Sequence, residues 1–594
     1  MKTIGCNLSI MNKIYDVIVI DSGVNDKEID AIYIQKKNGK YTINDEVEDH
    51  LDHGTNVVKL INKNYKKKIL MIKIIDNKDE IISENQLIYI LNYIYKFLKC
   101  KIINISLGVS VVTSNRLYNI CKKIRKRNIF INCAFNNDKS ISYPAFFDCV
   151  FGVDCDFNLK KTDDYIFLKN NPFINILAYG SIQRVNKKEK IFESVWGTSF
   201  ACANFTRILY DIIIKKQFNV YKELEINAKY LFKFKESTII HTPFNLEYIK
   251  SKKVAIFPFS KENQNILRLV NDIPINIVDF YDFKESGRVN SNLNYIYKLN
   301  GKDYIVKNIE KLEIESFDTL LIGHINRYNS KIQENIYSII KMCIKKNKKI
   351  ISYDDLKFEN NLYFTPKFKK IESLSLLMGK LFKFNTPILL SCGTGSKEGK
   401  FTFQVKLKSY LENRQYNIAF IGSEPNSFLF GAKDCIHCGY NSNLIEFTHR
   451  ELISNINYRL HLIDEKNFDM IIIGSQANIL SRNYNSVENI QLENFSYFAA
   501  INPDVITLNI HCEDDINYIK KSISFMTSLN DCHIAGIIVF PLKNVNNKNS
   551  LITEEERQKI LNELKINFPN IPVAFLDDNI ALKEIFDNII SFFI

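Results

Sequence analysis

Three separated segments of the chain carry, in the order Asp, His, Ser, the residue types of an acyl-transfer triad. Asp21 follows the apolar run 17–20, His53 precedes Gly-Thr, and Ser199 follows another Gly-Thr pair. A serine hydroxyl becomes a strong nucleophile when an imidazole with an ordinary pKa of about 6.5 takes its proton. A carboxylate fixes the tautomer of that imidazole and stabilises its charged form. We therefore predict Ser199 as nucleophile, His53 as general base and Asp21 as the supporting carboxylate.

The sequences of these segments resemble those of the subtilase family of serine proteases, whose signatures read D-[ST]-G, H-G-T-x-V and G-T-S-x-A. The resemblance covers about residues 15–235 and implies a serine endopeptidase built on a parallel sheet with flanking helices. It also implies that Asn136 donates to the oxyanion beside the Ser199 backbone N–H. The implied substrate-binding residues form the strand that pairs with an extended peptide and the adjacent pocket wall: Ser106, Leu107, Gly108, Ala134 and Phe135.

Two positions depart from the family pattern. Phe135 stands where the family usually has glycine, so a phenyl ring in the pocket would favour a small residue, glycine or alanine, before the cleaved bond. The alternative is that the Phe135 ring turns into the core. Ala203 replaces a proline that helps a helix to start but is not required there. We expect activity to survive the change at Ala203.

A second set of residues with chemical potential lies in the C-terminal half, after the apolar run 387–390. A Gly-rich turn there resembles a P-loop, in which backbone N–H groups and a lysine hold phosphate, and it contains Gly393, Gly395, Gly399, Lys400 and Thr402. Phe401 takes the usual position of the Mg²⁺-binding hydroxyl, which leaves Thr402 next in line. Asp469 is the nearest further carboxylate for a metal. We expect ATP or GTP with Mg²⁺ as candidate ligands, against the alternative of a Gly-rich turn with an exposed lysine.

Four stretches of the second half are similar to a family of peptide-maturation proteins associated with bacteriocin-like peptides: 255–267, 393–402, 422–425 and 439–442. The resemblance implies that the protease substrate is a precursor peptide whose leader must be removed. It also makes an exporter and other maturation proteins candidate partners. Proteolysis itself needs no cofactor. Cys435 and Cys438 have the spacing of half a zinc site, but no paired second half follows, so no metal site is predicted.

The elements that must position these residues follow from the alternation of short apolar runs with longer amphipathic ones. This alternation predicts parallel sheets covered by helices, and thus an α/β fold throughout. The first part should be subtilisin-like, the second a small Rossmann-like α/β domain, and the third a P-loop-like, doubly wound α/β domain. The predicted boundaries are 1–235 for the protease domain, 236–252 for a linker, 253–385 for the small α/β domain and 386–594 for the last domain.

Composition limits the compartment and the class of partner. With 46% hydrophobic and 24% charged residues, the chain reads as globular, and its apolar runs are too short to span a membrane. Thirteen irregularly spaced cysteines, no secretion signal and only 20 residues before Asp21 predict a cytoplasmic enzyme without a propeptide. The formal charge of +13 is spread along the whole chain, so no specific nucleic-acid role is expected.

The sequence therefore predicts an intracellular, subtilisin-like endopeptidase that cleaves a precursor peptide. Two alternatives stay open at this point. One is a non-proteolytic scaffold whose cleft only grips the leader peptide. The other is a nucleotide-dependent peptide-modifying enzyme in which the protease domain is an accessory.

Overall fold

The computed structural model describes residues 8–593 except 38, 78–79, 170–174, 189–190, 216–218, 234–251, 261–262, 264–265, 268, 270–272, 274, 294–303, 326–327, 366–378, 437–446, 477, 484, 486–491 and 546–547. The chain folds into two compact units. The first contains residues 1–239 and 372–383, and the second contains 240–371 and 384–594. The first unit therefore includes a stretch of chain that the sequence placed in the small α/β domain.

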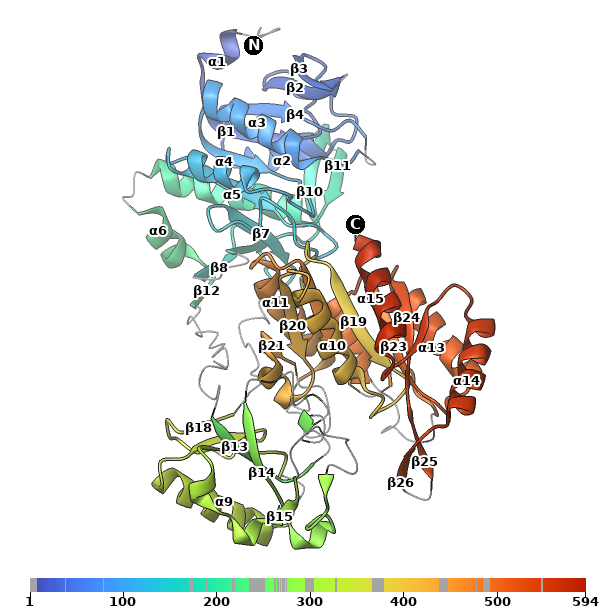
Figure 1. Ribbon diagram of the computed structural model, residues 1–594. Coiled ribbons are helices and arrows are strands. Elements are labelled where there is room, and N and C mark those ends of the chain that lie inside the picture. Colours follow the sequence, from blue (N-terminus) through green and yellow to red (C-terminus); the bar gives the residue numbers. More distant parts are fainter. Residues whose placement is uncertain are drawn as a thin grey trace. The chain divides into compact units, whose positions relative to one another are not determined.

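A ten-stranded, mostly parallel sheet forms the middle of the first unit, in the order β12-β8-β9-β7-β6-β5-β1-β4-β2-β3 (Figure 1). Its strands are β1 (Ile14–Asp21), β2 (Asp30–Lys37), β3 (Lys40–Asn44), β4 (Ile69–Lys73), β5 (Lys99–Ile105), β6 (Phe130–Ala134), β7 (Phe151–Asp156), β8 (Tyr165–Lys169), β9 (Ile176–Tyr179) and β12 (Tyr230–Lys233). The inner strand β1 is buried from Val17 to Asp21. A strand covered on both faces needs an uninterrupted apolar sequence, which explains the run 17–20.

Helices cover both faces of this sheet: α2 (His53–Ile61), α3 (Glu84–Phe97), α4 (Arg116–Arg125), α5 (Thr198–Ile214) and α6 (Val220–Asn227). The long helix α5 packs on β5, β6, β7 and β9 and also contacts α2, while α3 and α4 pack together. The short helix α1 (Leu8–Met11) precedes the sheet, and β10 (Gln183–Lys188) with β11 (Ile191–Val195) forms a separate hairpin.

The parallel register brings the ends of several strands to one edge of the sheet. Ile20 lies opposite Ile105 of β5, and Asp21 lies opposite Lys73 of β4. Ile105 in turn lies opposite Cys133 of β6. The carboxyl ends of β1, β5 and β6 thus lie side by side, which is where α/β folds place their sites.

The second unit holds two all-parallel sheets (Figure 1). The six-stranded sheet has the order β15-β14-β13-β16-β17-β18 and consists of β13 (Lys253–Phe257), β14 (Asn276–Asp282), β15 (Val306–Asn308), β16 (Thr319–Ile322), β17 (Lys349–Ser352) and β18 (Tyr363–Phe364). Helix α9 (Ser330–Lys345) joins β16 to β17, and three short 3-10 helices lie in the loops: η3 (Lys284–Ser286), η4 (Ile309–Lys311) and η5 (Ile314–Ser316).

The seven-stranded sheet has the order β21-β20-β22-β19-β23-β24-β27. Its strands are β19 (Ile388–Gly393), β20 (Ile418–Gly422), β21 (Asp434–Cys435), β22 (Met470–Gly474), β23 (Val505–His511), β24 (His533–Phe540) and β27 (Val573–Phe575). The helices are α10 (Lys400–Glu412), α11 (His449–Asp464), α12 (Leu492–Ile501), α13 (Ile516–Leu529), α14 (Glu554–Asn567), α15 (Asn579–Phe593) and the 3-10 helix η7 (Pro425–Phe430). An antiparallel hairpin of β25 (Leu542–Val545) and β26 (Lys548–Leu551) follows β24.

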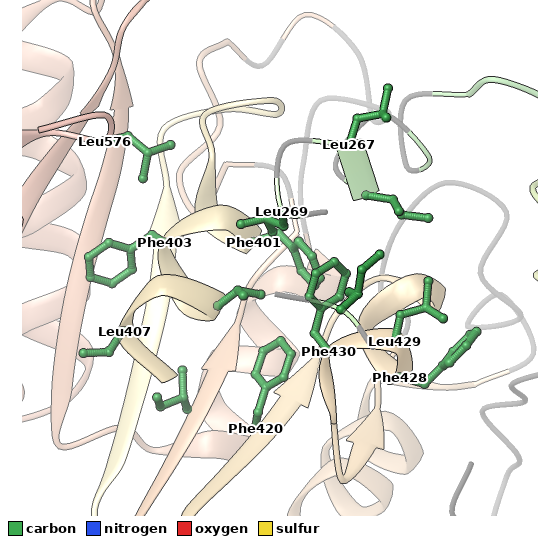
Figure 2. Packing of buried hydrophobic residues seen from close by; sticks show 14 of the residues in the cluster. Leu267, Leu269, Phe401, Phe403, Leu407, Phe420, Phe428, Leu429, Phe430 and Leu576 are labelled. Atoms are coloured by element: carbon green, nitrogen blue, oxygen red, sulfur yellow. The ribbon is translucent and has the colours of Figure 1, made fainter. Parts of the chain in front are cut away.

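An apolar cluster connects the two sheets of the second unit. Figure 2 shows Leu269 beside Phe401, the second residue of α10, and Leu267 and Phe430, the last residue of η7, belong to the same cluster. The Phe401 and Phe430 rings meet edge to face with centroids 5.1 Å apart. Phe401 is therefore a core residue that packs residues from both predicted C-terminal domains together.

The predicted alternation of strands and helices is present in both units. The predicted apolar run 17–20 lies in β1, and the run 387–390 overlaps the start of β19. Nearly all of the predicted linker 236–252, and the stretch 439–442, lie outside the described residues. No helix in the described part of the chain is both long enough and apolar enough to cross a bilayer.

Candidate active site

Asp21 and His53 form a close pair at the carboxyl edge of the first sheet. Asp21 ends β1 and is 1% exposed, and its Oδ1 lies 2.7 Å from His53 Nδ1. His53 is the first residue of α2, and its side chain is 32% exposed. A carboxylate on Nδ1 selects the tautomer in which Nε2 can accept a proton, which is the state that a general base requires.

A second carboxylate, Asp49, holds the turn that presents His53. Asp49 Oδ1 accepts from the Ser22 hydroxyl (2.8 Å), and its Oδ2 accepts from the Thr55 N–H (2.7 Å). The Ser22 hydroxyl in turn accepts from the Gly54 N–H (3.0 Å). These bonds satisfy N–H groups of the first turn of α2, which have no partner within the helix. The sequence analysis missed Asp49, although a carboxylate just ahead of a helix is a usual capping signal.

The electrostatic surroundings of His53 favour its protonated form. Burial, the largest contribution, lowers the pKa of His53, but the charge and hydrogen bond of Asp21, with a smaller contribution from Asp49, outweigh it. The net pKa is therefore raised above its ordinary value. An imidazole held this way is ready to take up a proton, which is the property that a general base needs.

Ser199 lies in the first turn of α5 and is 8% exposed. Its hydroxyl donates to the Ser106 carbonyl (3.1 Å) rather than to His53. The next residue, Phe200, contacts the His53 ring with centroids 5.2 Å apart, so the start of α5 lies beside the imidazole. Gly197 caps α5 with φ +113°, and a Cβ there would lie only 2.7 Å from Asn137 Oδ1. Glycine is thus required on both conformational and steric grounds.

A buried polar network fixes the strand end opposite Ser199. Asn104, inside β5, accepts from the Thr206 hydroxyl of α5 (2.7 Å) and donates to the Ser106 hydroxyl (2.9 Å). Asn132 of β6 donates to the same Thr206 hydroxyl (2.9 Å). The network ties two strands to the helix that carries the serine. A polar residue in the middle of an apolar strand is the sequence signal that could have revealed it.

The structure distinguishes two neighbouring asparagines after β6. Asn136, the predicted oxyanion donor, donates instead to the Ser140 hydroxyl within its own turn (2.8 Å). Asn137 accepts from both the N–H (2.9 Å) and the hydroxyl (3.0 Å) of Thr198, the residue before Ser199. The structure therefore holds Asn137 against the residue before Ser199, whereas the Asn136 amide is bonded within its own turn.

The predicted substrate-binding residues lie on both sides of this turn. Ser106, Leu107 and Gly108 continue the chain beyond the end of β5, and Ala134 is the last residue of β6. Phe135 is 2% exposed, and its ring packs where a Cβ on Gly152 of β7 would lie, 2.7 Å from Cε2. The ring therefore turns into the core, as the alternative had it. The preference for a small residue before the cleaved bond loses its structural basis.

Residues 15–228 match the model of the Subtilase family. This match spans the Asp21, His53 and Ser199 segments together with both buried networks described above. Residues 15–228 of the first unit are therefore similar to the subtilase family. No curated protein matches this sequence.

Several solved structures show partial likeness to the chain. A DUF1611 family protein from Anabaena variabilis is 12% identical with a TM-score of 0.41, over 57% of this chain and all of that one. The prenylagaramide maturation protease PagA is 17% identical with a TM-score of 0.26, over 35% of this chain and 78% of its own. The nisin leader peptidase NisP from Lactococcus lactis is 13% identical with a TM-score of 0.28, over 37% of this chain and 86% of its own.

The Gly-rich turn of the second unit connects β19 to α10, as the P-loop resemblance requires. Lys400 is the first residue of α10, and its ammonium donates to the Gly395 carbonyl (2.5 Å). Gly399 has φ +76°, and a Cβ there would meet Leu576 at 2.2 Å, so this glycine is also sterically required. Phe401 points into the apolar cluster, whereas the Thr402 hydroxyl is buried without a partner among the described residues.

Two features of this turn differ from expectation. The Glu398 carboxylate lies inside it, 3.9 Å from the Lys400 ammonium, and burial raises the pKa of Glu398. Asp469 precedes β22 and bonds Asn417 at the amino ends of the strands, the edge opposite the turn, so it cannot serve as a metal carboxylate there. Asp514, which accepts from the Thr394 hydroxyl, is the carboxylate that the structure places beside the turn.

The described residues contain no cluster of three or more side chains suited to hold a metal ion. Cys435 of β21 donates to the Glu424 carbonyl, and burial raises the pKa of its thiol to about 12. Its predicted partner Cys438 lies outside the described residues.

Proposed function

We propose that the subtilase domain is a serine endopeptidase in which Asp21, His53 and Ser199 act as the triad. The observation that carries the proposal is the 2.7 Å contact between Asp21 and His53 directly beside the start of α5. In this proposal, the Ser199 hydroxyl leaves the Ser106 carbonyl by rotation about χ1 and then donates to His53 Nε2. Catalytic hydrogen bonds of this kind often form fully only when substrate is bound.

In this proposal, His53 takes the Ser199 proton as the hydroxyl attacks the scissile carbonyl. The oxyanion then receives hydrogen bonds from the Ser199 N–H and from Asn137 Nδ2, because the Oδ1 end of that amide is held by Thr198. His53 passes its proton to the leaving amine, and an acyl-enzyme forms on Ser199. Water, deprotonated by His53, releases the acyl product and restores the hydroxyl.

The proposed substrate is an extended precursor peptide whose leader is removed in a cytoplasmic maturation system. Residues 106–108 continue from β5 as irregular chain, and such a segment can pair with an added peptide strand. The similarity of 255–267 and 393–402 to peptide-maturation proteins supports a precursor peptide. All eleven cysteines in the described part of the chain are unpaired thiols, which suits a reducing compartment.

Quenched-fluorescence peptides from an unbiased library test this function against the scaffold alternative. We expect cleavage by the wild type and none by Ser199→Ala, with both variants binding the same peptides. Binding without cleavage by the wild type would support the scaffold and contradict the protease. Ser140→Ala, in the turn after Asn137, is a matched hydroxyl deletion that should retain cleavage.

A second candidate function, phosphate binding by the turn 393–402, is favoured by the buried, unpartnered Thr402 hydroxyl near Lys400. Lys400, Gly399 and Thr402 would hold ATP or GTP with Mg²⁺ if the Glu398 carboxylate moved or took up a proton. Calorimetric titration of ATP and GTP should show binding to the wild type, none to Lys400→Ala and tighter binding to Glu398→Gln. Equal binding to Lys400→Ala would contradict the P-loop interpretation.

A further inference from the structure

The segment 379–383 belongs to the first unit although it lies more than 140 residues beyond the end of the subtilase match. Lys380 is its most buried residue, with 1% of its side chain exposed. Phe382, 5% exposed, packs edge to face on Phe146 with centroids 5.4 Å apart. The side chains of Leu381 and Lys383, by contrast, are exposed. Buried and exposed side chains therefore alternate along this segment, and its buried face packs on the protease domain.

The Lys380 ammonium completes a buried charge cluster around Asp154 of β7. Asp154 is fully buried, and its Oδ2 accepts from Lys380 Nζ (2.6 Å). Its Oδ1 accepts from Lys139 Nζ (3.2 Å) and from the Cys155 N–H (2.7 Å). A carboxylate without solvent needs such partners, because loss of one leaves a buried charge uncompensated.

Neighbouring groups stabilise the positive charge of Lys380 against the effect of its burial. Burial lowers the pKa of Lys380, and the charge and hydrogen bond of Asp154 act against that effect. The ammonium also lies 4.7 Å from the centre of the Phe135 ring, within cation–π range. The buried Phe135 ring therefore contacts the Lys380 ammonium instead of lining an open pocket.

The same ammonium reaches the turn that carries the two asparagines. Lys380 Nζ donates to the Lys139 carbonyl (3.3 Å), and the Lys139 N–H donates to the Asn136 carbonyl (3.2 Å). Phe135 precedes this turn and Lys139 follows Asn137, so Lys380 contacts the chain on both sides of Asn137. Thr198 holds the Asn137 amide itself.

We propose that Lys380 is a positioning residue of the protease site: by joining Asp154, Phe135 and the Lys139 carbonyl, it holds the turn that presents Asn137 to the oxyanion. This proposal rests on the proposed serine endopeptidase. If Lys380 has this role, residues 15–228 alone do not form the complete protease site, because residues 379–383 supply the segment that fixes the oxyanion turn.

The reaction of the full chain with a fluorophosphonate probe tests this role, because phosphonylation of Ser199 needs the same oxyanion donors. We expect Lys380→Met, which keeps length but removes charge, to lower the maximal inactivation rate constant by about 10- to 100-fold, as a small displacement of a catalytic group does. The concentration of probe at half-maximal rate should change little. Lys380→Arg should recover most of the rate, and the control Lys383→Met should match the wild type.

The outcomes distinguish failure of the proposed serine endopeptidase from failure of the positioning role of Lys380. A wild type that does not react overturns the endopeptidase and the role of Lys380 together. A wild type that reacts, with Lys380→Met reacting equally fast per folded molecule, overturns only the role of Lys380. If Lys380→Met does not fold, the double variant Lys380→Met with Asp154→Asn removes both buried charges, and a wild-type rate in that variant would equally overturn the proposal.

Discussion

The two units each contain a His–Asp pair with the same central distance, and only one of them lies in a candidate active site. His53 Nδ1 is 2.7 Å from Asp21 Oδ1, and His324 Nδ1 is 2.7 Å from Asp354 Oδ1. The His53 side chain is 32% exposed and lies beside the start of α5, whereas the His324 side chain is 8% exposed. Asp354 also accepts from the Ile325 N–H (2.6 Å), so this second pair fixes the loop after β16. The contact between the two side chains is therefore not what makes a general base; exposure and a neighbouring nucleophile are.

Removal of the nucleophile should separate the two pairs most strongly. Ser199→Ala is expected to lower peptide hydrolysis by about six orders of magnitude, since loss of a catalytic serine removes the covalent route. Both His–Asp pairs remain in this variant. Steady-state hydrolysis of a cleaved library peptide measures the loss, and retention of more than a hundredth of the wild-type rate would contradict the assignment of Ser199.

Matched substitutions of the two carboxylates compare the pairs directly. Asp21→Asn should reduce kcat by about 10⁴-fold, because the amide favours the wrong imidazole tautomer. Asp354→Asn should leave kcat unchanged and lower the free energy of unfolding by about 1–3 kcal/mol through its buried hydrogen bonds. Hydrolysis assays with thermal denaturation give both quantities. A large loss of kcat in Asp354→Asn would show that the second pair is also part of the reaction.

The two asparagines after β6 offer a smaller but equally specific comparison. Asn137→Ala should reduce kcat by about 10²–10³-fold with little change in KM, as loss of one oxyanion donor does. Asn136→Ala removes only the bond to Ser140 and should have a much smaller effect. The reverse order of effects would restore the original prediction from sequence, in which Asn136 is the donor.

The pH dependence of hydrolysis should show the smallest effect, a shift of one limb of the profile. His53 acts as a base only when neutral, and its pKa is raised because Asp21 outweighs the effect of burial. Activity should therefore fall as the pH drops through a value above about 6.5, the ordinary histidine pKa. The stabilising effect of the protonated pair has the opposite dependence: it is full below about 6.5 and is lost as the pH rises through the raised pKa. Profiles of kcat/KM and of Tm against pH test both directions, and a limb below pH 6 would contradict the raised pKa.

The sequence was sufficient for the elements that carry Asp21, His53 and Ser199, because these elements depend on local patterns. The apolar run 17–20 predicts β1, and the signatures around His53 and Ser199 place them at the starts of α2 and α5. The hydrogen bonds between Asn137 and Thr198 could not be predicted in this way, because these residues lie 61 positions apart.

Lys380 shows the same limit over a longer distance. In the sequence it is one of many lysines, and the predicted boundary at 385 assigns it to another domain. Its role arises from a contact with Asp154, 226 positions earlier, that only the fold creates. Asp469 shows an error of the opposite kind: it lies next to Lys400 in neither sequence nor space, because it precedes β22 and the parallel register puts it at the opposite edge of the sheet from Lys400.

The position of a covalent fluorophosphonate adduct tests the central claim most directly. Full-length protein is labelled, digested and analysed by tandem mass spectrometry, with Ser199→Ala as the control. We predict one adduct on the Ser199 hydroxyl, lost in Ser199→Ala and strongly slowed in Asp21→Asn but not in Asp354→Asn. A folded wild type without an adduct, or with its adduct on another residue, would contradict the serine endopeptidase.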